Sequence, residues 1–198
     1  MPQPLPGGDV LSVGYGEGGR GVLLLTNSES GVSRLLGQAS LGGYTGIGKA
    51  ILNPAGSRIA LEALRPDGGA DLLLLDSKGT LQRKITGGWW NRPLAWSTDG
   101  TFYYLVTTCR SGLVLAYELH SLKGSSDTLL VSGGTLGDIG EAVATDAGLV
   151  YVRSTEGGLA VRGPQTAIAG PSELWVIEPQ SGNRSPLISA SDGITALR

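Results

Sequence analysis

The feature that most constrains the fold is a repeat of turn-like segments, each ending in glycine before a β-rich run. The four turns end at Gly8, Gly56, Gly100 and Gly148, so their spacings are 48, 44 and 48 residues. A nearly constant period of this size is typical of a propeller or a solenoid.

Each period contains four short apolar runs separated by polar or glycine-rich turns. In the second period these runs cover residues 49–52, 58–63, 70–76 and 81–86. They are too short for helices, are rich in Val, Ile, Leu, Tyr and Thr, and are bounded by turn-forming residues. No window offers the ten or more residues of 3.6-residue periodicity that a helix needs. The pattern therefore predicts an all-β propeller of four-stranded antiparallel blades, about four of which are present.

The period also predicts that the chain forms a single propeller domain or part of one. The expected blades cover about residues 1–46, 47–88, 89–135 and 136–190, and residues 191–198 form a closing strand or the first strand of a further blade. No apolar run precedes Gly8, so we expect the first blade to begin inside its repeat unit. Two arrangements stay open, a closed four-bladed ring and a fragment of a larger ring.

Several segments resemble the blades of TolB-type, WD-repeat-like propellers. These are residues 53–61, 69–76 and 81–86, and the strongest local match is the Leu-Ala-Trp-Ser-Thr-Asp-Gly segment at 94–100. The fourth period departs most, because its turn is Thr-Asp-Ala-Gly and it carries a long insert. The resemblance implies a β-propeller in a periplasmic or extracellular parent protein, and it says little about function.

The composition excludes several classes of function. A net charge of −2 gives no basic surface for nucleic acid. The single cysteine, Cys109, and the single histidine, His120, exclude disulfide frameworks, multi-cysteine clusters and two-histidine metal sites. The first residues lack a basic start and a long apolar stretch, so we expect no signal peptide in this chain, and its apolar runs are too short to span a membrane. We therefore expect no cofactor, no metal, no nucleic-acid partner and no membrane insertion.

Two glycine motifs resemble nucleotide-binding sequences but lack the required context. Residues 43–49 fit G-x-x-x-x-G-K, yet Ala50 replaces the Ser or Thr that would bind magnesium, and a turn follows where a helix is needed. Residues 14–19 fit G-x-G-x-x-G but run into another strand. His120 is expected at a surface or edge and Cys109 in a hairpin turn. No catalytic residue is expected.

One face of the propeller is a candidate binding surface, because loops between blades share it with the loops between second and third strands. The candidate residues on these loops are Tyr44, Arg65, Trp89, Trp90, Asn91, Arg92 and Arg110. Aromatic and arginine side chains are enriched in binding hot spots. Successive residues of an extended chain point to opposite sides, so we expect Trp89 to be the exposed member of the tryptophan pair. A glycine-rich insert at 156–172 is a second irregular loop of this face.

These observations favour a non-catalytic binding or scaffold propeller that recognises a protein, peptide or glycan partner. The alternative is the substrate-gating propeller of a larger hydrolase, such as a prolyl-oligopeptidase-like peptidase, and a downstream hydrolase domain would support it. A third possibility, a sugar lyase or lactonase within these residues, is disfavoured by the single histidine.

Overall fold

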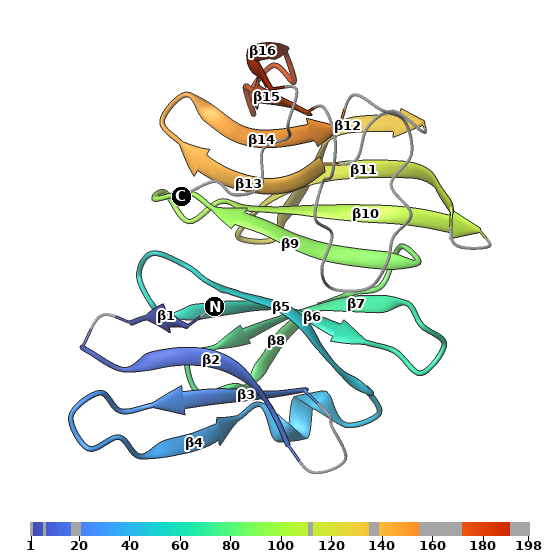
Figure 1. Cartoon of the computed structure of the whole chain (residues 1–198). Coiled ribbons are helices and arrows are strands. Elements are labelled where there is room, and N and C mark those ends of the chain that lie inside the picture. The colour runs from blue at the N-terminus through green and yellow to red at the C-terminus, as the bar shows by residue number, and fades with distance from the viewer. Residues whose placement is uncertain are drawn as a thin grey trace. The chain divides into compact units, whose positions relative to one another are not determined.

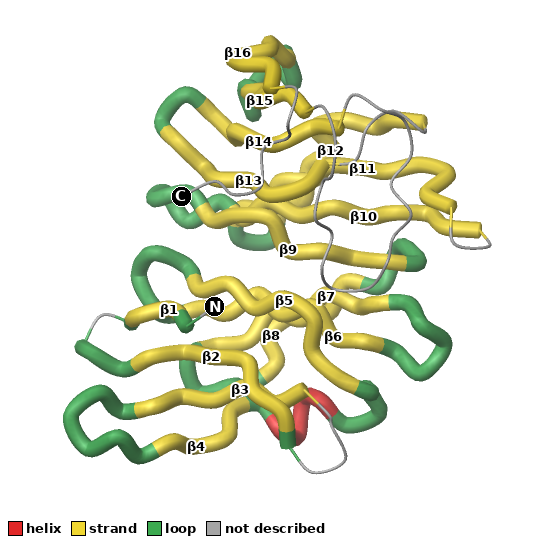
Figure 2. Tube along the Cα trace, viewed as in Figure 1, coloured by secondary structure: helices red, strands yellow, loops and turns green. Residues whose placement is uncertain are grey.

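The computed structural model describes residues 2–5, 7–16, 21–110, 113–134, 139–154 and 172–190 (Figure 1, Figure 2). Apart from one 3-10 helix, η2 (Gln38–Leu41), every regular element among these residues is a β-strand. The all-β prediction is therefore confirmed. The chain divides into two compact units, Met1–Pro93 and Leu94–Arg198. No helix among the described residues is long and apolar enough to cross a membrane.

The first unit contains two antiparallel four-stranded sheets. The first sheet runs in the order β1 (Gln3–Pro4), β2 (Val10–Tyr15), β3 (Gly21–Thr26) and β4 (Ser33–Leu36). The second sheet consists of β5 (Gly46–Leu52), β6 (Arg58–Leu64), β7 (Ala70–Asp76) and β8 (Leu81–Ile85). Each strand pairs with its neighbour in sequence, which is the meander of a propeller blade.

The second unit repeats this organisation. Its first four-stranded meander consists of β9 (Trp90–Trp96), which begins within the first unit and forms one parallel bridge with β7 there, β10 (Phe102–Arg110), β11 (Leu113–Lys123) and β12 (Ser126–Gly134). The other sheet consists of β13 (Ile139–Thr145), β14 (Gly148–Ser154), β15 (Ser172–Ile177) and β16 (Arg184–Ala190). In Figure 1 the colour runs from blue at β1 to red at β16.

The glycines that mark the repeat are required by the backbone of their turns. Gly8, Gly56, Gly100 and Gly148 have φ angles of 89°, 68°, 82° and 126°. This region is accessible to glycine at little cost and strained for residues with a Cβ atom. The repeat in the sequence therefore arises because each of these turns requires a residue with left-handed backbone.

The core of the first unit lies between its two sheets. Leu23 and Leu36 from the first sheet are buried in one cluster with Leu61, Leu73 and Leu75 from the second. Strand β7 is buried on both faces, because Leu72 and Leu74 are also buried. Fully burying one such leucine is worth about 1.5–3 kcal/mol.

The expectation that no strand precedes Gly8 is wrong. Strand β1 pairs with β2 through Gln3 and Leu11 and through Pro4 and Val10. The Gln3 side chain also donates to the carbonyl of Ala50 (2.6 Å) and accepts from the Leu52 amide (2.8 Å). The strand has only two residues and contains proline, which an edge strand tolerates, so it has no recognisable strand pattern.

Cys109 and His120 lie in the two long strands β10 and β11. Cys109 lies within β10 and pairs with Val114, so it is not in a hairpin turn. Strand β11 continues past His120 to Lys123, so His120 lies inside a strand. His120 stacks on Tyr104 with ring centroids 5.0 Å apart, and its nitrogens lie 3.1 Å from Glu118 and 3.2 Å from Asp127. Glu118 and His120 therefore lie on one face of β11.

Three sequence features fall wholly or partly outside the described residues. They are the end of the second glycine motif at residues 17–19, the glycine-rich insert apart from Ser172, and the C-terminal segment 191–198.

Candidate functional site

A polar cluster lies at the ends of β6 and β7 in the first unit, and Asp71 is its centre. The Asp71 side chain is only 3% exposed. One of its oxygens accepts from the Tyr44 hydroxyl (2.7 Å) and lies 2.9 Å from the Lys84 ammonium. The other oxygen accepts from the Arg65 guanidinium at 2.7 Å. This carboxylate is thus neutralised and fully coordinated by its own chain.

The turn between β6 and β7 positions Arg65 over this carboxylate. The Arg65 amide donates to the Gly69 carbonyl (2.8 Å), and the Asp67 carboxylate accepts from the Gly69 amide (3.1 Å). Asp67 also accepts from Arg65 Nε at 3.1 Å. The Pro-Asp-Gly segment sets this tight turn, and its Asp orients the arginine.

Arg65 also holds the link between β8 and β9. Its guanidinium donates to the Trp89 carbonyl (3.1 Å) and lies 5.7 Å from the centroid of the Trp89 ring. A Cβ atom on Gly69 would lie 2.5 Å from that carbonyl, so only glycine permits this approach. The Trp89 ring is therefore fixed on the β6–β7 turn by a cation–π contact and a backbone hydrogen bond.

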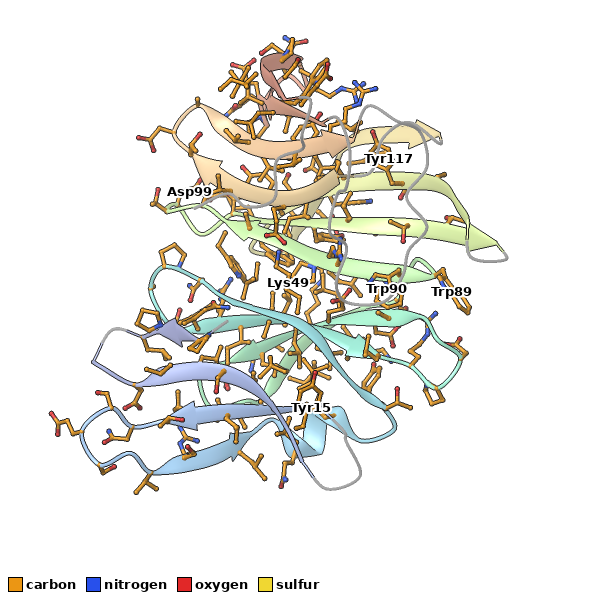
Figure 3. All side chains as sticks on the ribbon, viewed as in Figure 1. Tyr15, Lys49, Trp89, Trp90, Asp99 and Tyr117 are labelled. Atoms are coloured by element: carbon orange, nitrogen blue, oxygen red, sulfur yellow. The ribbon has the colours of Figure 1, made fainter. Side chains whose placement is uncertain are left out.

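Trp89 is the exposed member of the tryptophan pair, as predicted. It is 39% exposed, whereas Trp90 is 8% exposed. Figure 3 shows Trp89 at the end of the strands and Trp90 further in. Ala70 forms a parallel bridge with Trp90 and donates its amide to the Trp89 carbonyl (3.0 Å). The alternation of an extended chain explains the opposite directions of the two rings.

The residues after Trp89 form a second, buried cluster around Glu62, whose side chain is fully buried. Trp90 Nε1 donates to this carboxylate, and Arg92 Nε lies 4.0 Å from it. Asn91 is also fully buried and donates to the Ala70 carbonyl at 2.9 Å. The link between β8 and β9 is therefore held on its inner side by Trp90, Asn91 and Arg92. Trp89 forms its exposed surface.

Glu62 also explains the motif that resembles a phosphate-binding loop. Its carboxylate accepts from the Lys49 amide (2.9 Å), and a Cβ atom on Gly48 would lie 2.2 Å from one of its oxygens. Both residues belong to strand β5. The second glycine of the motif makes room for a buried carboxylate, and no helix N-terminus is present to bind a phosphate.

The two buried carboxylates have pKa values shifted in opposite directions. Burial raises the pKa of Glu62, and Arg92 and Trp90 only partly oppose the shift. Burial would also raise the pKa of Asp71, but the hydrogen bonds from Lys84, Arg65 and Tyr44 outweigh it and lower the pKa. Burial raises the pKa of Tyr44, and the contacts with Tyr44 and Asp71 raise that of Lys84. Each of these groups is hydrogen-bonded or ion-paired within the chain, so none is positioned as a general acid or base.

The structure brings together three of the residues that the sequence singled out, Tyr44, Arg65 and Trp89. The sequence reasoning missed Asp71 and Lys84, which complete this group. A usable signal existed, because Asp71 stands before four consecutive leucines in a strand that is otherwise apolar. Arg110 ends strand β10, but its side chain lies outside the described residues.

No metal site is apparent in the part of the chain that the structure describes. Within it, no three side chains of His, Cys, Asp or Glu are grouped to hold a metal ion.

Replacing Asp71 with Asn is expected to lower the free energy of unfolding by about 1–3 kcal/mol, because one of the three donors then faces an amide. Asp67→Asn is the matched control, since Asp67 binds the same arginine but is 57% exposed, and exposed pairs contribute about 0–1 kcal/mol. Because the folded pKa of Asp71 is lowered, its stabilisation is present above about pH 3.9 and is lost as the pH falls through the folded value. Urea unfolding between neutral and acidic pH checks this prediction. Equal losses in the two variants would contradict it.

Comparison with solved structures identifies the fold. A scan against sequence profiles of protein families finds no match, and a search of curated proteins finds none. Among solved structures, a TolB-type protein from Agrobacterium tumefaciens has a TM-score of 0.54 and 16% identity, covering 98% of this chain and 81% of its own. This chain has a TolB-like β-propeller fold. The identity is low enough that the similarity describes the fold alone.

Two enzymes contain similar propellers. A prolyl endopeptidase matches with a TM-score of 0.63 and 18% identity over 98% of this chain and 29% of its own length. An oligogalacturonate lyase, solved in complex with manganese, matches with a TM-score of 0.59 and 14% identity over 92% of this chain and 50% of its own. This chain therefore spans less than a third of the endopeptidase and half of the lyase.

Proposed function

We propose that this chain is a non-catalytic binding propeller that recognises a polypeptide partner through Trp89. The observation that carries the proposal is an exposed indole held in place by Arg65, above a carboxylate that is already neutralised. Such an aromatic group offers contact area with little loss of conformational entropy on binding. The surrounding charges satisfy one another, which suits recognition better than proton transfer.

The chemistry around Trp89 also limits the kind of partner. Arg65 and Lys84 are balanced by Asp67 and Asp71, so the cluster carries no net charge. A neutral surface around an indole favours an apolar or aromatic side chain of a protein or peptide. A glycan stacked on the same ring is the alternative that the experiment distinguishes.

Replacing Trp89 with Ala is expected to weaken partner binding by at least about 2 kcal/mol, the usual effect of truncating a hot spot. The melting temperature should fall by only about 2–4 °C, since the partly exposed ring contributes about 1 kcal/mol to stability. Leu81→Ala is the control, because Leu81 is 41% exposed in the same unit. The measurement is affinity capture from the source organism, with melting curves for each variant.

Unchanged capture by the Trp89 variant would contradict the proposal. Loss of capture with a collapsed melting temperature would also count against it, because Trp89 would then be a structural residue. Partners removed by glycosidase treatment would assign the surface to a glycan.

A second candidate is the propeller portion of a larger hydrolase. The supporting observation is that 98% of this chain matches 29% of the prolyl endopeptidase. A G-x-S-x-G hydrolase sequence downstream in the full open reading frame would favour this candidate.

A further inference from the structure

A cavity of about 490 Å³ lies in the second unit, between its two sheets. Tyr117 and Ser132 line it from β11 and β12, and Arg153, Trp175 and Arg184 line it from the other sheet. This volume is within the range of small-molecule sites, about 300–1,000 Å³. None of these residues belongs to the cluster around Trp89.

The walls of the cavity are set by the register of the strands. Tyr151 pairs with Trp175, and Ile177 pairs with Arg184, so these side chains share the face that carries the buried core, with Arg184 at its exposed edge. On the opposite wall, a Cβ atom on Gly133 would lie 2.6 Å from the Tyr117 ring. The missing side chain at Gly133 lets the Tyr117 ring lie across β12, and Figure 3 shows this residue within the second unit.

Two guanidinium groups line the cavity, and neither forms an ion pair with a carboxylate of the described residues. Within the described residues, no Asp or Glu oxygen lies within 4 Å of either Arg153 or Arg184. Glu173 is opposite Arg153 in the register, but it accepts from Trp175 Nε1 at 2.7 Å. Arg153 lies over the Trp175 ring, 5.2 Å from its centroid. Burial raises the pKa of the Tyr151 hydroxyl, and the nearby Arg184 guanidinium partly opposes this shift.

We infer that this cavity binds a small organic carboxylate whose flat body packs between Tyr117 and Trp175. The planar fork of arginine matches a carboxylate in a bidentate geometry. A cavity in which two guanidinium groups face aromatic rings provides both the charge and the apolar wall that such a ligand needs. Asn183, also on the lining, offers an amide to a further polar group.

The test uses benzoate as the probe and benzamide as its neutral counterpart of the same shape. The reporter is the indole N–H resonance of Trp175 in a ¹⁵N-labelled sample, assigned with Trp175→Phe and followed at constant ionic strength. Benzoate is expected to shift this resonance saturably, and benzamide is not. Arg153→Ala and Arg184→Ala should each weaken binding by about tenfold or more. Arg34→Ala, which removes an exposed guanidinium from the first unit, should leave binding unchanged.

Four results would overturn the inference. They are the absence of a saturable shift with benzoate, an equal shift with benzamide, equal binding in all three arginine variants, and a saturable shift when inorganic phosphate is added in place of benzoate. Melting curves identify variants that fail to fold, and Arg184→Gln replaces Arg184→Ala if that variant unfolds. Because Trp89 is not involved, failure of this test is independent of the proposed function.

Discussion

Glu62→Ala is expected to lower the free energy of unfolding by about 3–5 kcal/mol, the usual cost of removing one partner of a buried ion pair. The Lys49 amide and Trp90 Nε1 lose the oxygens that accept their hydrogen bonds. Arg92 loses the carboxylate 4.0 Å from its Nε, at a side chain that is 17% exposed. Urea unfolding at neutral pH measures the loss. Glu29→Ala is the control, since Glu29 is exposed and should change stability by less than about 0.5 kcal/mol.

The Glu62→Gln variant separates the charge from the hydrogen bonds. Glutamine keeps the volume and one acceptor, so we expect a smaller loss of about 1–3 kcal/mol. Because burial raises the folded pKa of Glu62, the folded state binds this proton more tightly than the unfolded state. Its contribution is therefore most favourable below about pH 4.3 and declines as the pH rises through the folded value. Glu62→Gln should remove that decline, and a Glu62→Ala variant as stable as Glu29→Ala would refute the role of Glu62.

Gly79→Ala is expected to destabilise the first unit by about 2–5 kcal/mol. Gly79 has a φ of 83°, which costs a residue with a Cβ atom about 1–2 kcal/mol. The new Cβ atom would also lie 2.4 Å from the Gly37 nitrogen and 2.9 Å from its Cα. Both contacts are with backbone, which cannot rotate away, so overpacking adds about 1–3 kcal/mol.

Gly100→Ala is the matched control for this prediction. Gly100 has a φ of 82° in an equivalent turn, and a Cβ atom there would meet nothing within 4 Å. It should cost only the backbone strain of about 1–2 kcal/mol. Equal losses in the two variants, measured by urea unfolding, would show that contact with Gly37 contributes nothing.

The fold could be predicted from the sequence because its signals are local. Four turns that need left-handed glycine recur at a regular spacing, and each is followed by short apolar runs. The two errors concern β1 and Cys109, which lies within β10. Neither segment is an apolar run in the sequence, and each is recognised as a strand only through its pairing with a neighbouring strand.

The candidate site was predicted less completely, because its contacts join distant parts of the chain. Aromatic and arginine content pointed to Trp89 and Arg65. The carboxylate between Arg65, Tyr44 and Lys84 was missed, although Asp71 stands out in an apolar strand. Glu62 is a similar case, since it is the one charged residue of β6 that is buried. A charge inside an apolar run indicates a buried partner, but sequence alone does not identify that partner.

Site-specific cross-linking at Trp89 tests the proposed recognition surface most directly. A photoreactive phenylalanine analogue is placed at position 89 in one sample and at position 81 in another, and each protein is irradiated in extract of the source organism. We expect a cross-linked polypeptide, identified by mass spectrometry, from position 89 and none from position 81. Adducts of equal yield from both positions, or none from position 89 in a protein that melts normally, would contradict a binding role for Trp89.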